Sequence, residues 1–356
     1  MATHPIPDNR HEFEIAVVCA LAREYNAVYR LVDQVWDKDY GRADGDLNTY
    51  TTGRIGSFDV VLVRLSGMGK RIAASAAASL RSSYPGLTLV LLTGICGGVP
   101  LTKTGGAVLL GDVVISNAVV QYDLARRYPD ASATKDSAED RLSKPNKNIL
   151  NFVALLETEA ELERLRQRTA FFLQEMQSSS EAQTWGGASY EYPGAAQDRL
   201  FEASYPHKHQ IPPMQCDCAD WRKVSDPVCD DSRNLSCGQV GCDGRFLVRR
   251  ERVVMNLQLE REGRGKEAQV PSIFVGCVGS ADTVLKSGED RDRIAKRHDI
   301  VAFEMESAGV WEELPCIMVK GVCDYADSHK NKSWQDFAAA TAASRMWEIG
   351  TGTVLD

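Results

Sequence analysis

The sequence predicts an α/β fold with a largely parallel central sheet, interrupted by a helical, cysteine-rich insertion. Residues 14–123 alternate short apolar runs with helical patterns, and this alternation returns from residue 271. Such alternation is typical of strand-helix-strand units with parallel strands. The segment between is polar and holds half of the ten cysteines. We therefore expect residues 1–130 and 251–356 to form one domain, with residues 131–250 as the insertion.

Four strands are predicted in the first part of the chain. Short apolar runs bounded by turn residues indicate buried strands; the runs are EIAVVCAL (14–21), FDVVLVRLSGMG (58–69), LTLVLLTGICGGV (87–99) and GDVVISNAVVQYD (111–123). The first run leads into AREYNAVYRLVDQV, whose apolar residues have helical spacing. The second leads into an alanine-rich helix that Pro85 and Gly86 end.

The rest of the chain predicts one long helix and then renewed alternation. Residues 151–177 form an amphipathic pattern that indicates a single helix. Further strands are expected in 271–285 and in CIMVKGVC (316–323). The closing helix SWQDFAAATAASRMWEI is expected to begin at Ser333 as its N-cap.

Charge and composition exclude several classes of partner. The formal net charge is -8, which argues against a nucleic-acid or anionic-membrane surface, since both require a basic face. No window holds about 18 consecutive apolar residues, so no membrane-spanning helix is expected. The N-terminus lacks the basic and apolar regions of a signal peptide, and a cytoplasmic location is the expectation.

Glycine turns and acidic residues follow the predicted strands. In open α/β sheets, ligands bind at the carboxyl ends of the strands. Glycines at such ends let the backbone approach a ligand and expose amide N–H groups. Burying a carboxylate is costly unless something binds it. The residues at these ends are Arg23-Glu24, Ser66-Gly67-Met68-Gly69, Thr93-Gly94-Ile95-Cys96-Gly97-Gly98, Ser280-Ala281-Asp282 and Asp324. Glu304 and Glu306 begin the buried helix-strand unit that Asp324 ends.

Five motifs of the chain recur in an order that resembles a known family. SGMG, TGICGG, GDVVIS, FEMESAG and GVCDYAD resemble motifs of the nucleoside phosphorylase/nucleosidase superfamily, and the chain is most similar to its fungal nucleosidase-like domains. The resemblance covers about residues 14–125 and 271–348. It implies a three-layer α/β/α sandwich with a mixed, largely parallel sheet, cleavage of N-glycosidic bonds, and a homo-oligomer, most simply a dimer.

The resemblance also implies roles for individual residues. Glu306 would accept hydrogen bonds from the two ribose hydroxyls, which suits an ionised carboxylate because it only accepts. Asp324 would be the general acid that protonates the leaving base, and Glu24 would activate water. The alternatives are that Glu306 and Asp324 cap a helix and a turn, and that Glu24 is a solvated helix acid. The other substrate-binding residues implied are Met305, Phe303, Gly67, Thr93, Gly94, Cys96, Gly97, Asp282 and Val284.

The same resemblance favours hydrolysis of an adenine nucleoside or nucleotide without a catalytic cofactor. Phosphorylases of this superfamily hold phosphate with an arginine just before the glycine turn, where this chain has Thr93. The chain also departs from the family at Ile95, Val284 and Cys323, which bear on the choice of base. Basic side chains in or beside the loops at the strand ends could hold phosphates, so the substrate could be adenosine or a nucleotide such as AMP or ATP. A phosphate-dependent phosphorylase and a catalytically silent nucleotide-sensing module are the alternatives.

Five cysteines crowd into 27 residues of the insertion and suggest a structural metal site. They are Cys216, Cys218, Cys229, Cys237 and Cys242. Four of them could bind one zinc ion tetrahedrally, with His207 or His209 as alternates. Such a zinc would stabilise a weakly hydrophobic segment. Disulfides and free thiols are the alternatives; the remaining cysteines lie singly in apolar runs and are expected in the core.

Overall fold

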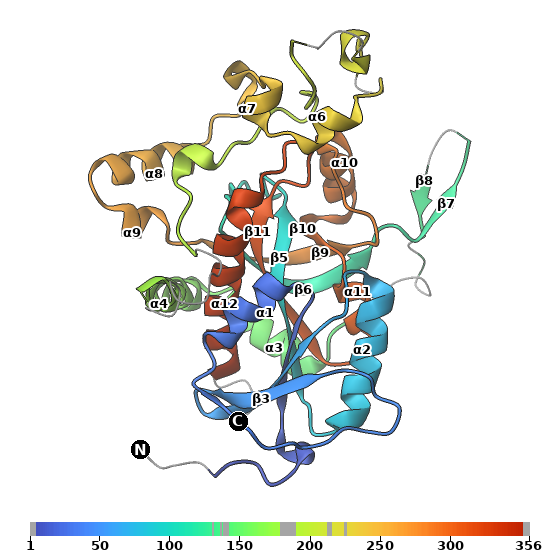
Figure 1. Ribbon diagram of the computed structural model, residues 1–356, viewed down its shortest axis with the longest axis vertical. Coiled ribbons are helices and arrows are strands. Elements are labelled where there is room, and N and C mark those ends of the chain that lie inside the picture. Colours follow the sequence, from blue (N-terminus) through green and yellow to red (C-terminus); the bar gives the residue numbers. More distant parts are fainter. Residues whose placement is uncertain are drawn as a thin grey trace.

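The computed structural model describes residues 5–129, 132–135, 137, 142–178, 190–211, 216–223 and 226–351. A nine-stranded sheet forms the centre of this part, with helices on both of its faces (Figure 1). In spatial order the strands are β10 (Ile300–Glu304), β9 (Ile273–Ser280), β6 (Val113–Gln121), β11 (Cys316–Asp324), β5 (Leu89–Gly98), β1 (Ile15–Cys19), β4 (Phe58–Arg64), β3 (Tyr50–Ile55) and β2 (Gln34–Val35).

The sheet is mixed, with parallel pairing at its centre. β1 pairs in parallel with β4 and β5, β5 with β11, and β9 with β6 and β10. β6 runs antiparallel to β11, as do β3 to β4 and β2 to β3. All five residues of β1 are buried, as expected for a strand covered on both faces. The predicted α/β fold with a mixed, largely parallel sheet is confirmed.

Helices complete the outer layers. α12 (Gln335–Thr351) and α1 (Ala22–Tyr29) cover one face, and α2 (Lys70–Ser83) and α11 (Ser307–Val310) lie across the sheet from them (Figure 1). The remaining helices are α3 (Lys147–Leu156), α4 (Glu159–Ser178), α6 (Asp230–Asn234), α7 (Cys237–Val240), α8 (Glu251–Arg261), α9 (Gly265–Ala268) and α10 (Gly288–His298). A two-stranded ribbon, β7 (Ala125–Arg127) and β8 (Ser132–Thr134), stands apart from the sheet (Figure 1).

The long helix predicted over 151–177 is two helices, α3 and α4. Thr158 lies between them, and its hydroxyl donates to the carbonyl oxygen of Leu155 at 2.9 Å. Threonine makes such local bonds in competition with the helix interior. Leu165 and Leu173 of α4 are buried in the main hydrophobic core, so this part of the predicted insertion packs against the α/β layers. The boundaries at 131 and 250 stay a prediction, since parts of 131–250 lie outside the described residues.

Within the described residues, none of the helices has the length and apolarity needed to span a bilayer.

The prediction that Ser333 caps the closing helix is wrong. A 3₁₀ turn, Lys332–Trp334, precedes α12, and the side chain of Asn331 accepts from Ser333 N at the start of that turn.

Candidate active site

A cavity of about 260 Å³ opens at the carboxyl ends of β1, β5, β10 and β11. Glu24, Glu306 and Asp324 all line it, although 300 residues separate the first from the last. Five further residues of the predicted site also line it, namely Met305, Phe303, Cys96, Gly97 and Val284. Four do not: Gly67, Thr93, Gly94 and Asp282.

Strand pairing around Gly97 brings these segments together. The end of β10 pairs with the end of β5, so that Phe303 lies opposite Gly97. On the other side of β5, β11 places Asp324 opposite the same glycine. A Cβ added at Gly97 would lie 2.9 Å from Asp324 Oδ1. Gly97 therefore leaves the room in which the Asp324 carboxyl group reaches the cavity.

Glu24 is buried and held by three backbone amides. Its Oε2 accepts from the N–H groups of Ala20 and Leu21 at 2.9 and 2.8 Å, and its Oε1 accepts from Ile95 N at 2.8 Å. An ionised carboxylate offers about four acceptor positions. One position on Oε1 thus remains for a further donor from the cavity. The solvated helix acid considered above does not describe Glu24, which is only 2% exposed.

Gly94 serves Glu24 instead of lining the cavity. A Cβ added at Gly94 would lie 2.2 Å from Glu24 Oε1, so only glycine leaves space for this carboxylate. Thr93 is fully buried within the sheet, where it lies opposite Val319 of β11. Gly94 therefore affects the cavity by leaving room for Glu24, and Thr93 belongs to the sheet behind the cavity.

Glu306 faces a buried lysine. Its Oε2 lies 3.7 Å from Lys320 Nζ, and its Oε1 accepts from Gly69 N at 3.3 Å. Burial raises the pKa of Glu306 to about 7; Lys320 opposes the rise, and the carboxylates of Glu304 and Glu24 add to it. Protonation of Glu306 is therefore expected in the neutral range.

Lys320 is the residue that the sequence reasoning missed. It is fully buried, and among the described residues no acceptor forms a hydrogen bond with its Nζ. Burial by itself lowers the pKa of Lys320, but the carboxylates of Glu24, Glu306 and Glu304 outweigh it, so the pKa is raised. The available signal was a lysine inside an apolar strand pattern, four residues before Asp324.

Glu304 also lines the cavity, but its carboxylate is held by backbone and side-chain donors of the next turn. Its carboxylate accepts from Glu306 N at 2.9 Å, and from the backbone N–H and the hydroxyl of Ser307. These bonds satisfy the free amides at the start of α11 and fix the backbone that carries Glu306.

Asp324 forms contacts that differ from those of Glu24. Its Oδ1 accepts from Ala326 N at 2.8 Å and lies 3.2 Å from Lys330 Nζ. The thiol of Cys323 is 3.5 Å from Oδ2. Asp324 and Lys330 both line the cavity, so an acid and a base from one short segment face the ligand space together.

The outer wall of the cavity is apolar. Phe303 packs edge-on against Tyr122 with ring centroids 5.4 Å apart. Met68 and Val284 also line this wall and are about half exposed. Glu24 and Glu306 are thus buried, whereas the apolar side chains of Met68 and Val284 lie at the mouth, an arrangement suited to a ligand with a polar sugar and a flat, less polar group.

Asp282 and nearby basic residues are engaged outside the cavity. Asp282 accepts from Lys70 N at 2.8 Å, which attaches its loop to the start of α2. The Lys70 ammonium pairs with Asp123, and Arg291 is buried and donates to the carbonyl oxygen of Tyr325. These two cations are thus occupied by protein groups.

The five clustered cysteines divide into two groups, one with two histidines and the other with one. One group is Cys237 and Cys242 with His207 and His329, and the other is Cys216, Cys218 and Cys229 with His209. Within each group the four donor atoms lie within 4.8 Å of one another. All ten cysteines are free, so no disulfide joins them. Either group has the donor atoms that could hold a metal ion.

Comparison with known proteins gives a family match over part of the chain. Residues 14–145 match the phosphorylase superfamily. The resemblance to this superfamily is thereby confirmed. The matched segment contains Glu24, whereas Glu306 and Asp324 lie beyond it.

One relative aligns over nearly the whole chain. A nucleotide-binding leucine-rich repeat (NLR)-like protein of Hyaloscypha variabilis is 26% identical over 339 residues; these cover 94% of this chain and 28% of that protein. The chain thus spans little more than a quarter of the length of this relative.

Solved structures of similar fold include a 5′-methylthioadenosine/S-adenosylhomocysteine nucleosidase from Neisseria meningitidis (TM-score 0.47, 19% identity, 95% of this chain and 98% of that one). A futalosine hydrolase of Helicobacter pylori is similar at a TM-score of 0.46 and 15% identity, over 94% of this chain and 96% of that one.

Proposed function

We propose that this chain hydrolyses the N-glycosidic bond of a purine nucleoside or nucleotide and releases the free base. One observation carries the proposal: Glu24, Glu306 and Asp324 line a single cavity at the carboxyl ends of the strands. Carboxylates beside an apolar wall match the needs of a reaction that develops positive charge on a sugar. The partial match to the phosphorylase superfamily supports the same chemistry.

Each acid has a role that its contacts allow. The free acceptor position on Glu24 Oε1 takes a proton from water as the water oxygen attacks the anomeric carbon of the ribose. The bond between this carbon and the base nitrogen breaks, and its electron pair stays on the purine. The Asp324–Lys330 pair supplies the proton that neutralises the leaving base. Glu306 accepts hydrogen bonds from the two ribose hydroxyls, and Lys320 balances the charge of the buried carboxylates.

Hydrolysis is favoured over phosphorolysis because the anion-binding groups are occupied. The N–H groups of Ala20, Leu21 and Ile95 could bind phosphate, but all three donate to Glu24. Of the side chains that the structure describes, no arginine lines the cavity. A phosphate ion would therefore meet a carboxylate where it needs donors.

Adenine remains the proposed base, with adenosine, AMP or ATP as the nucleoside or nucleotide. The cavity of about 260 Å³ is near the lower end of the range of roughly 300–1,000 Å³ typical of small-molecule sites. A nucleoside fills such a space, and its 5′ substituent would extend past the half-exposed Met68 and Val284. We also propose a homodimer and, by resemblance, no catalytic cofactor.

The proposal is tested by following free adenine from adenosine, AMP and ATP, each with and without phosphate. Release without phosphate is expected. Asp324→Asn should lower turnover by about 10²–10⁴-fold while the substrate still binds. Asp44→Asn, at an exposed position that does not line the cavity, is the matched control. Strict dependence on phosphate would indicate a phosphorylase. Binding without any release would indicate a nucleotide-sensing module. The similarity to a protein named as nucleotide-binding and NLR-like is compatible with that alternative.

A further inference from the structure

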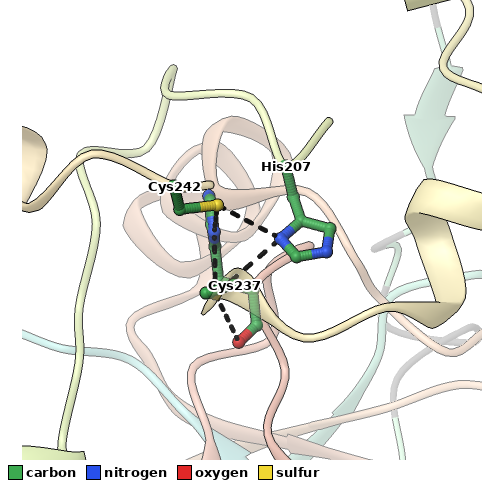
Figure 2. Close-up of side chains that lie close together, drawn as sticks. His207, Cys237 and Cys242 are labelled. Atoms are coloured by element: carbon green, nitrogen blue, oxygen red, sulfur yellow. Dashed lines mark hydrogen bonds between the residues drawn. The ribbon is translucent and has the colours of Figure 1, made fainter. Parts of the chain in front are cut away.

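The first Cys/His group has the dimensions of a tetrahedral zinc site. His207 Nδ1 lies 3.8 Å from Cys237 Sγ and 3.6 Å from Cys242 Sγ (Figure 2). His329 Nδ1 lies 3.6 and 3.7 Å from the same two sulfurs. Zinc bond lengths of about 2.3 Å to sulfur and 2.0–2.1 Å to nitrogen give N···S edges of about 3.6 Å in a tetrahedron. All four observed distances agree with this value.

Hydrogen bonds between the side chains do not account for the group. Four N···S contacts share the hydrogens of two thiols, so at most half of the contacts can be hydrogen bonds. A cation at the centre lies within bonding distance of all four atoms at once. Such an ion requires both sulfurs to be deprotonated, and its binding releases their protons.

Both histidines are oriented as metal ligands. His207 Nε2 lies 3.0 Å from the carbonyl oxygen of Leu235, and His329 Nε2 lies 3.0 Å from that of Tyr205. A carbonyl only accepts, so in each ring Nε2 carries the hydrogen and Nδ1 presents its lone pair to the sulfurs. This fixed tautomer is the usual arrangement of a histidine that binds metal through its other nitrogen.

The second group repeats these dimensions with three cysteines and one histidine. His209 Nδ1 lies 3.5 Å from Cys216 Sγ and 3.4 Å from Cys229 Sγ. Cys218 Sγ lies 3.7 Å from Cys229 Sγ, against an S···S edge of about 3.8 Å for zinc. The single zinc expected from the sequence thus becomes two possible sites with separate ligands.

His329 distinguishes the first group, because it comes from the segment that follows Asp324. Asp327 Oδ1 accepts from His329 N at 2.9 Å, and the His329 ring stacks on Phe201 at 4.3 Å. The next residue, Lys330, reaches back to Asp324. Within the segment, Ala326 has a φ of 50°, a conformation that costs about 1 kcal/mol or more for a residue with a side chain and needs external support.

We propose that the chain binds two zinc ions, and that the ion held by His207, Cys237, Cys242 and His329 fixes the segment from Asp324 to Lys330. Three of its ligands belong to residues 207–242 and the fourth to the segment itself. The bound metal therefore attaches the cysteine-rich region to the wall of the cavity. The effect on catalysis rests on the proposed function, whereas the metal binding does not.

Metal content tests the sites directly. Elemental analysis of the purified chain should give about two zinc ions per chain for the wild type, and about one for His329→Ala and for Cys216→Ser. His329→Cys should retain both ions, because a thiolate replaces the imidazole. A wild-type content of one ion or fewer, or unchanged content in His329→Ala, would overturn the proposal.

Hydrogen exchange tests the attachment without any need for turnover. The amides of residues 324–330 should exchange at least about tenfold faster in His329→Ala than in the wild type. Cys216→Ser, which removes the other ion, should leave these rates unchanged, and His329→Cys should restore them. Equal exchange in wild type and His329→Ala would refute the attachment.

Activity is a separate arm of the same experiment. His329→Ala should lower base release by about 10–100-fold, as expected when a group that orients a ligand-bearing segment is lost. Cys216→Ser should lower it by less. If the wild type releases no base, the proposed function fails, but zinc content and exchange still decide the metal proposal.

Discussion

Replacing Gly94 with alanine tests whether the site depends on the buried carboxylate of Glu24. The new Cβ would lie 2.2 Å from Oε1 and 2.4 Å from the carboxyl carbon, where ordinary contacts are 3.4–4 Å. Glu24 must therefore move by more than about 1 Å and lose part of its three amide bonds. Hydrogen bonds to a charged group contribute about 1.5–3 kcal/mol each, so we expect a loss of roughly 2–5 kcal/mol in unfolding free energy.

Urea unfolding measures this loss. Adenine release should fall by about 10²-fold or more, because Glu24, the general base, is displaced from its position. Gly265→Ala is the control, since nothing lies within 4 Å of an added Cβ there. The double variant Gly94→Ala/Glu24→Ala should be no less stable than Glu24→Ala alone, because the methyl group then fills vacated space. Wild-type stability and turnover in Gly94→Ala, or additive losses in the double variant, would refute the reasoning.

Two further predictions concern the charges at the inner end of the cavity. Since the pKa of Glu306 is raised to about 7, the ionised form that accepts both ribose hydroxyls grows as pH rises. The affinity of Asp324→Asn for adenosine, measured by calorimetry, should increase about tenfold from pH 6 to pH 8, and Glu306→Gln should flatten this profile. Lys320→Met leaves three buried carboxylates without their cation and should cost about 3–5 kcal/mol at pH 8. The cost should be smaller at pH 6, where Glu306 is protonated; an equal difference in unfolding free energy between wild type and Lys320→Met at both pH values, measured in urea, would contradict this.

Local patterns were sufficient for much of the fold. The runs at 14–21, 58–69, 87–99 and 111–123 contain β1, β4, β5 and β6, because a buried parallel strand must be apolar on both faces. The prediction of a single helix over 151–177 was wrong at Thr158. Its hydroxyl forms a local hydrogen bond with Leu155 O, and hydrophobic periodicity carries no information about such a bond. β10 and β3 were not predicted from the sequence.

The sequence by itself determined the α/β class and the glycine turns at strand ends, since these follow from periodicity and local motifs, and the resemblance of its motifs to a known family predicted the three acids. Only the tertiary structure decided that the end of β10 pairs with β5, which puts Glu306 and Asp324 on one cavity with Glu24. It also decided that Lys320 faces those acids. It further decided that His329 joins Cys237 and Cys242, which precede it by 87 residues or more along the chain. Such contacts depend on strand order and chain crossings, and residue spacing along the chain does not encode them.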